Sequence, residues 1–166
     1  MSNIWDKITT DKWLSEEWVT DFIALFKEQF VRDFNFLPDP LPEGEDPLQY
    51  ISDEDIARAL YEALAIFPAD IFEEIRIRLL ALLYLTAHYL CEDFRNAQQG
   101  LNSVGTYPAT SKTVRNVSEA YALPSWVTRN PVLSYISETG YGKKYLSLYW
   151  PRTIGRMRVV GGWTLA

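Results

Sequence analysis

Three stretches of the chain repeat apolar residues at the spacing of an α-helix. The first is expected to begin after Ser15 as N-cap, with Glu16 and Glu17 favouring the positive end of the helix dipole. The second is expected to begin after Ser52, where Asp55 sits at the third helical position as in a capping box, and to stop at Pro68. Each stretch carries one apolar face, made by Trp18, Phe22, Leu25, Phe26 and Phe30 in the first and by Ile56, Ala59, Leu60, Ala63, Leu64 and Phe67 in the second.

The third stretch predicts a long helix over residues 71–98. It starts amphipathic, but from Leu79 to Cys91 it is apolar on nearly every side. Such a helix is buried by neighbours in most directions. The pattern therefore predicts a mainly α protein, a small helical bundle around this central helix, with the first two helices packed against it.

Two segments break the helical pattern. Residues 37–48 hold four prolines and four acids, which predicts an exposed acidic proline-rich loop. Residues 100–138 are rich in Gly, Ser, Thr, Asn and Pro, and contain one strand-like run, 112–123. The alternation of that run is too weak to bury either face within a monomer, so we expect an ordered loop whose strand pairs with another chain.

The end of the chain predicts a last helix over 139–150, closed by Pro151, and an extended docking tail over 151–166. All 166 residues are expected to form a single domain, because the 36 residues before the acidic loop would make a poor core alone. No apolar run approaches the roughly 20 residues needed to span a bilayer, and no secretory signal opens the sequence, which predicts a soluble protein.

Charge is distributed unevenly along the chain. Residues 1–74 hold 18 of the 22 acids and 5 of the 16 bases, whereas residues 75–166 hold 4 acids and 11 bases. Five bases and no acid follow Thr139. This division suits a subunit whose two ends meet different partners, although a random arrangement remains an alternative.

The only histidine, His88, and the only cysteine, Cys91, lie three residues apart on the predicted central helix, so both could face one metal, with Glu92 beside them. A structural zinc site needs four ligands, mostly Cys and His, and the chain has no others. Since the surrounding run is apolar, we expect both residues in the core, with no metal and no cofactor. The helix is expected to regain solvent at the polar residues that follow, Glu92 and Asp93.

Other signatures of chemistry are weak. Paired acids such as Glu73 and Glu74 mostly fall in first helical turns, where the helix dipole accounts for them, but a carboxylate-based hydrolase using Glu73, Glu74 or Glu92 remains an alternative. The basic tail leaves open a regulatory module that binds nucleic acid. A short basic strip on an acidic chain is more often a protein-docking arm.

Most of the chain from Phe22 to Gly162 resembles the head–tail connector, or head-completion adaptor, proteins of tailed bacteriophages. The resemblance rests on the ordered segments "FKEQF", "ISDEDIARALYEA", "YLTAHYL", "SKTVRNVSEAYAL", "SETGYGKKYLSLYW" and "RVVGG". The segments "LTAHYL" and "TGYGKKYL" are the most specific. The longer N-terminus (1–21) and the acidic proline loop depart from the family's pattern.

The resemblance implies a non-enzymatic virion protein of the neck, assembled in the host cytoplasm. It would form a homo-oligomeric ring, usually a dodecamer, that joins the portal protein to the next neck or tail-completion protein. Genomic DNA would pass through its lumen without sequence-specific binding. The expected contacts are pairing between subunits through Val114, Val117, Tyr121, Tyr141 and Tyr145, and docking on the portal through Arg152, Arg156, Arg158 and Trp163.

Overall fold

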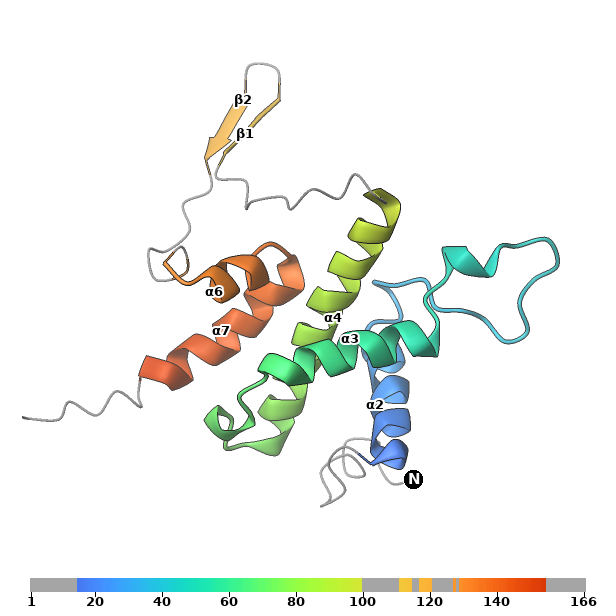
Figure 1. Cartoon of the computed structure of the whole chain (residues 1–166), viewed down its shortest axis with the longest axis horizontal. Coiled ribbons are helices and arrows are strands. Elements are labelled where there is room, and N and C mark those ends of the chain that lie inside the picture. Colours follow the sequence, from blue (N-terminus) through green and yellow to red (C-terminus); the bar gives the residue numbers. More distant parts are fainter. Residues whose placement is uncertain (1–14, 100–110, 115–116, 121–126, 128, 155–166) are drawn as a thin grey trace, which may run out of the picture.

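A computed structural model describes residues 15–99, 111–114, 117–120, 127 and 129–154 of the chain. The described part is mainly helical, which confirms the predicted fold class. A long central helix packs with the other described helices into one body, and a β-hairpin projects from this body (Figure 1). None of the described helices combines the length and the hydrophobicity that a transmembrane segment needs.

The first described helix, α2, spans Glu16–Gln29 and is capped by the Ser15 side chain, which accepts a hydrogen bond from the Trp18 amide. Its buried face is aromatic, as its sequence predicts. Phe26 and Phe30 lie 4.7 Å apart between ring centroids, and Phe26 also contacts Phe34 just beyond the helix, at 5.9 Å. This aromatic cluster fixes the start of the following loop against the body.

That loop is closed at its base by backbone contacts. The Leu37 amide donates to the Ile51 carbonyl and the Ile51 amide donates to the Asn35 carbonyl, each at 2.9 Å. Ile51 is 5 % exposed, whereas the chain between these bonds lies at the surface and carries a short 3₁₀ helix, η1 (Pro47–Gln49). Residues 37–51 therefore form an anchored surface loop, and below we call them the acidic loop.

Helix α3 spans Asp53–Ile66 and begins with the predicted capping box. The Asp55 amide donates to the Ser52 hydroxyl oxygen at 3.2 Å, and the Ser52 amide donates to the Asp55 carboxylate at 3.0 Å. Burial acts to raise the pKa of Asp55, but the Ser52 hydrogen bonds and the Arg58 guanidinium lower it overall. The apolar face of α3 packs on the central helix.

The central helix, α4, spans Ile75–Gln99, so the prediction that it begins at Ile71 is wrong. Residues Ala69–Ile71 instead form a short 3₁₀ helix, η2. Phe72 then turns into the core, fully buried, with its ring stacked 5.3 Å from that of Phe67. The Arg78 side chain donates two hydrogen bonds to the Phe72 carbonyl, at 3.1 and 2.8 Å, which holds this turn ahead of α4.

Two of the helices in the described part of the chain follow the hairpin. Helix α6 (Pro131–Ile136), which was not predicted, is capped by the Asn130 side chain and has Pro131 at its first position. Helix α7 (Gly140–Ile154) packs along α4. Pro151 does not close α7, contrary to the prediction, since the helix continues past it to Ile154 with the loss of one amide hydrogen bond.

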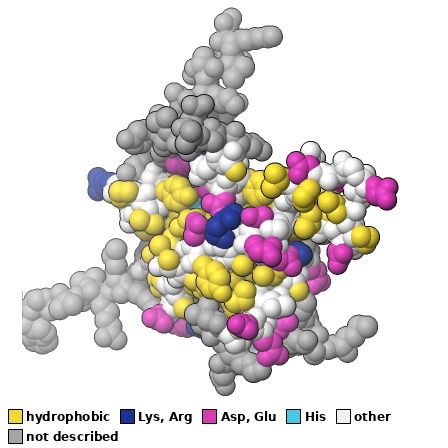
Figure 2. Space-filling view, turned by 45° about the vertical axis from the view of Figure 1, so that its right-hand side comes forward, with side chains coloured by type: hydrophobic (Ala, Val, Ile, Leu, Met, Phe, Trp, Pro, Cys, Tyr) yellow, Lys and Arg dark blue, Asp and Glu magenta, His cyan; other side chains and the backbone are white. Residues whose placement is uncertain are grey.

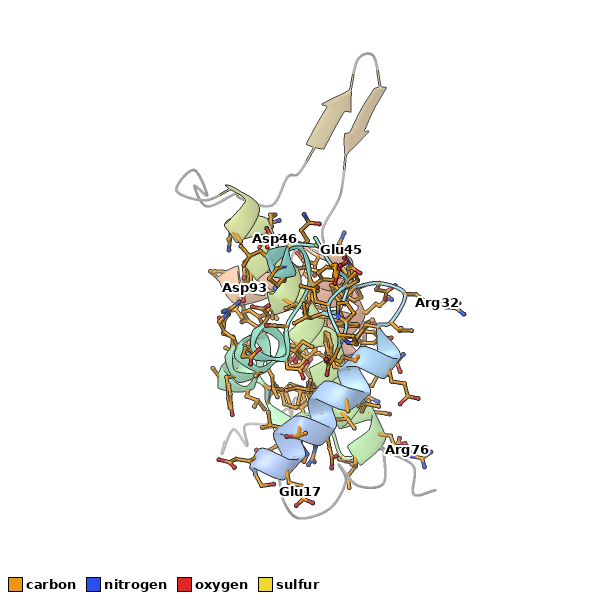
Figure 3. All side chains as sticks on the ribbon, turned by 90° about the vertical axis from the view of Figure 1, so that its right-hand side faces the viewer. Glu17, Arg32, Glu45, Asp46, Arg76 and Asp93 are labelled. Atoms are coloured by element: carbon orange, nitrogen blue, oxygen red, sulfur yellow. The ribbon has the colours of Figure 1, made fainter. Side chains whose placement is uncertain are left out.

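The described residues of the run 112–123, predicted as one strand, form the two strands of a hairpin instead. Strands β1 (Ser111–Val114) and β2 (Val117–Ala120) pair antiparallel, with Val114 opposite Val117 and Ser111 opposite Ala120. The run turns back on itself after Val114, so its first pairing partner is within the same chain. Figures 1 and 3 both show the hairpin extending beyond the helices.

Candidate functional site

The two segments that carry the family resemblance most specifically meet at one hydrogen bond. His88 on α4 is fully buried, as predicted, and its Nδ1 lies 2.8 Å from Oγ1 of Thr139. The same Thr139 oxygen accepts the amide hydrogen bond of Gly142 at 2.9 Å, and the Thr139 carbonyl accepts that of Lys143. Thr139 is therefore the N-cap of α7, and His88 holds this cap against the central helix.

The second glycine of the "TGYG" segment, Gly142, lies at a close approach between two helices. A Cβ atom built at this position would lie 1.6 Å from the Ile136 carbonyl oxygen, which is backbone and cannot rotate away. By contrast, a Cβ at Gly140 meets nothing within 4 Å. Only glycine at position 142 lets the end of α6 approach the start of α7 so closely.

A buried charge cluster lies one turn along α4 from His88. Glu92 is 3 % exposed and pairs with Arg95, which also donates to the Glu138 carboxylate at 3.0 Å. Burial raises the pKa of Glu92, Glu138 raises it further, and Arg95 opposes both. The expectation that α4 regains solvent at Glu92 is wrong, because this charge is compensated inside the fold, where it ties α4 to the turn between α6 and α7.

His88 lies in the core as expected, whereas Cys91 is only half-buried. Burial and the nearby Arg95 charge lower the pKa of His88 to about 4, so the ring is neutral at physiological pH. Burial and the Glu92 carboxylate raise the pKa of the Cys91 thiol to about 11, which keeps it protonated and a weak nucleophile. Across the described ranges, no three His, Cys, Asp or Glu side chains gather as metal ligands. Glu73 and Glu74 are exposed.

The described members of the predicted assembly set lie in three environments. Val114 and Val117 are cross-strand partners next to the hairpin turn. Tyr141 is half-buried between Phe30 and Phe34, with ring centroids 5.4 and 5.5 Å away. Burial, and then a hydrogen bond to the Asp33 carboxylate, raise the pKa of Tyr141.

Tyr145 needs a correction, because its side chain is already used inside the subunit, whereas portal docking by Arg152 stays a prediction. Tyr145 is 2 % exposed and stacks on Tyr149, so it belongs to the subunit's own core and not to a contact between subunits. The Arg152 side chain donates to the Leu148 carbonyl at 2.6 Å and lies 5.8 Å from the centre of the Phe72 ring. The Arg152 side chain therefore satisfies a backbone carbonyl in the last turns of α7. The remaining residues predicted for assembly, Tyr121, Arg156, Arg158 and Trp163, lie outside the described residues.

The surface offers one groove that sequence reasoning missed. It has a volume of about 390 Å³ and lies between the acidic loop, the start of α3 and the end of α4. Leu37 and Leu48 line its outer edge, and Phe94 lines its inner wall. Phe94 also lines a second hollow of about 360 Å³, together with Cys91 and Arg95. Exposed leucines among prolines and acids were the available signal for this surface.

Comparison with known protein families, with curated proteins and with solved structures finds no match to this chain.

Proposed function

We propose that the protein is a structural adaptor of a tailed-bacteriophage neck, which forms a homo-oligomeric ring between the portal vertex and the next neck or tail-completion protein. The β1–β2 hairpin is the observation that carries this proposal. It projects from the helical body and consists of two strands that pair with each other (Figure 1). A subunit of this shape is suited to joining neighbours and not to enclosing a substrate.

The hairpin is incomplete as a sheet. An isolated two-stranded hairpin is marginally stable in water, and the outer edge of each strand presents amides and carbonyls able to pair with a further strand. In the part of the chain that the structure describes, the sheet has no third strand. If the β1 edge of one subunit pairs with the β2 edge of the next, each hairpin gains two partners, and the repeated contact closes a ring.

The rigid helical body supports the same proposal. Strand pairing transmits a defined orientation only if the rest of the subunit is stiff. The His88–Thr139 bond and the Arg95 bridge between Glu92 and Glu138 join α4 to the start of α7. The His88–Thr139 bond connects "LTAHYL" to "TGYGKKYL", which gives a physical reason for both segments in an adaptor.

The test is direct visualisation of the purified full chain, alone and mixed with the portal protein of the same phage. We expect closed rings in negative-stain electron microscopy, either free or seated on the portal. Light scattering should give a matching mass. A protein that stays monomeric at high concentration and does not bind the portal would refute the proposal.

A further inference from the structure

The groove under the acidic loop is both apolar and negatively charged. Its lining includes two exposed leucines, Leu37 and Leu48, which are 37 % and 85 % exposed. Exposed apolar side chains that gather beside a groove are typical of an interaction site. Its floor includes Phe94 of α4. A groove with exposed apolar walls of this kind fits the side chains of an extended peptide segment.

The charge of this surface selects for a basic segment. The acidic loop carries four acids and no base, all four of them exposed: Asp39, Glu43, Glu45 and Asp46. Within the groove, Arg58 is bracketed by Asp55 and Asp93, at 2.9 and 3.2 Å, so the carboxylates outnumber it. Figure 2 shows hydrophobic and acidic side chains mixed over the right-hand side of the surface, and Figure 3 places Glu45, Asp46 and Asp93 toward the same end of the body.

The chain itself contains a segment of the complementary chemistry. Residues 155–166, "GRMRVVGGWTLA", carry two arginines, no acid and several apolar side chains, including a tryptophan. Arginine and tryptophan are the residue types that most often anchor protein interfaces. The segment matches the groove in both charge and apolar character.

The positions of the two surfaces suit contact between different subunits. Figure 1 shows α7 ending on one side of the body and the acidic loop projecting on the opposite side. Contacts between two different surfaces on opposite sides of a subunit are the kind that build rings. Twelve residues span at most about 40 Å when extended, which is enough to cross onto a neighbour.

We propose that the groove between the acidic loop, α3 and α4 binds residues 155–166 of an adjacent copy of this chain. The inference rests on the proposed ring and names its second contact, in addition to pairing of the hairpins. Arg156 and Arg158 face the acids of the loop, and the apolar residues of the segment cover Leu48 and Phe94. The portal, for which Arg156, Arg158 and Trp163 were predicted from the sequence, is the rival receptor for this segment.

The first measurement tests whether the groove by itself binds the peptide segment. A fluorescent synthetic peptide of residues 155–166 is titrated onto the full chain carrying Arg156→Glu and Arg158→Glu, whose own tail no longer competes. We expect saturable binding that weakens with salt. The affinity should fall at least tenfold with Leu48→Asp, or when both arginines of the peptide are glutamate. Val132→Asp, at a 49 % exposed position on α6, is the matched control and should bind normally.

The second measurement tests whether the contact joins subunits. In sedimentation velocity, Arg156→Glu/Arg158→Glu and Glu43→Arg/Glu45→Arg should each weaken self-association at least tenfold. An equimolar mixture of the two variants should restore it, because each tail then meets a groove of opposite charge. Glu16→Arg/Glu74→Arg changes the net charge equally on exposed positions near Glu17 and Arg76, at the far end of the body, and should leave association unchanged.

Each outcome decides between the hypotheses. Absent peptide binding, or binding that ignores Leu48→Asp, overturns the inference. Self-association that survives both charge reversals also overturns it, since the tail then docks on its own subunit or on the portal. Loss of portal binding by the tail variant, with subunit association intact, assigns the tail to the portal. Failure to form rings with wild-type protein and portal refutes the proposed function instead, whatever the peptide does.

Discussion

His88 and Thr139 lie 51 residues apart in the sequence, and their side chains meet at 2.8 Å between Nδ1 and Oγ1. Thr139 simultaneously caps α7 through the Gly142 amide. One hydroxyl group therefore starts a helix and attaches it to the central helix. We therefore expect Thr139 to contribute more to stability than an ordinary helix cap.

Thr139→Ala should lower the free energy of unfolding by about 2–4 kcal/mol. A lost cap costs about 1 kcal/mol, and a buried ring nitrogen left without its partner costs about 1–3 kcal/mol more. Thr139→Ser keeps the hydroxyl and should lose less than about 1 kcal/mol. Urea unfolding followed by circular dichroism measures both. Equal losses for the two variants would contradict the dual role of the hydroxyl.

The two glycines of "TGYG" should respond oppositely to alanine. Gly142→Ala forces a Cβ against the Ile136 carbonyl, so α6 and α7 must separate, and we expect a loss of about 3 kcal/mol or more, comparable to severe overpacking. Gly140→Ala places its methyl in open space at the first helical position and should be neutral or stabilising by up to about 1 kcal/mol. Thermal unfolding distinguishes them. Similar melting temperatures would mean that the close approach is not needed.

Acid should destabilise the fold through His88. Its pKa is about 4 in the folded protein against 6.5 ordinarily, so the unfolded chain takes up a proton before the folded one does. The contribution of the neutral ring is complete above pH 6.5 and is lost as pH falls toward 4, by about 3 kcal/mol in total. The raised pKa of Glu92 acts in the opposite direction and offsets part of this loss.

His88→Asn isolates the effect, because an amide can keep the hydrogen bond to Thr139 and does not titrate. The variant is expected to be less stable at neutral pH, since it removes buried ring atoms. Its unfolding free energy should fall less steeply than that of the wild type between pH 6.5 and 4.5. Denaturant titrations at several pH values give both slopes. Parallel slopes would show that another group governs the acid response.

Much of the body could be predicted because its signals are local. Ser52 and Asp55 lie three residues apart and cap α3 without help from distant parts of the chain. The aromatic repeat of α2 likewise depends only on helical spacing. The cap of α6 was equally local, since Asn130 precedes Pro131, but the surrounding turn-forming residues obscured it.

The rest depends on contacts that no short window contains. From the sequence, Glu92 was expected to mark the point where α4 returns to solvent. In the structure it lies in a buried cluster, because Arg95 pairs with both Glu92 and the distant Glu138. Phe72 fitted a helical stripe, yet stacking on Phe67 and the Arg78 bonds made it part of a turn. The run 112–123 lacks a glycine at its turn, so a hairpin was not distinguished from one strand.

Arg95 should be the most sensitive member of the buried charge cluster. Arg95→Met leaves the Glu92 and Glu138 carboxylates facing each other without compensation. Because the Arg95 side chain is itself 37 % exposed and water screens part of the interaction, the expected cost is about 1–3 kcal/mol at neutral pH. Adding Glu92→Gln should recover part of the loss, because one buried negative charge disappears. Equilibrium unfolding of the single and double variants gives the coupling energy. Additive losses would mean that the three charges act independently.

The hairpin edges give the sharpest test of the ring contact. Pairs of opposite residues in an antiparallel hairpin alternate between those that bond each other through their backbone amides and carbonyls and those whose amides point away from the partner strand. With two residues between Val114 and Val117, this pair is of the first kind. The next pair, Thr113 and Ser118, therefore directs its amides outward. Proline at an edge position removes an outward donor while sparing the internal ladder. Thr113→Pro and Ser118→Pro should therefore each abolish ring formation in negative-stain images and leave the helical circular dichroism signal unchanged.

The matched controls are Thr113→Ala and Ser118→Ala, which remove the same side chains but keep the amides. Both should form rings, because strand pairing uses the backbone and not these side chains. Reversal of the pattern, with alanine disrupting assembly as much as proline, would assign the contact to side chains instead. Rings that persist with both prolines would remove the hairpin from the interface between subunits. The docked tail would then be the remaining proposed contact that closes the ring.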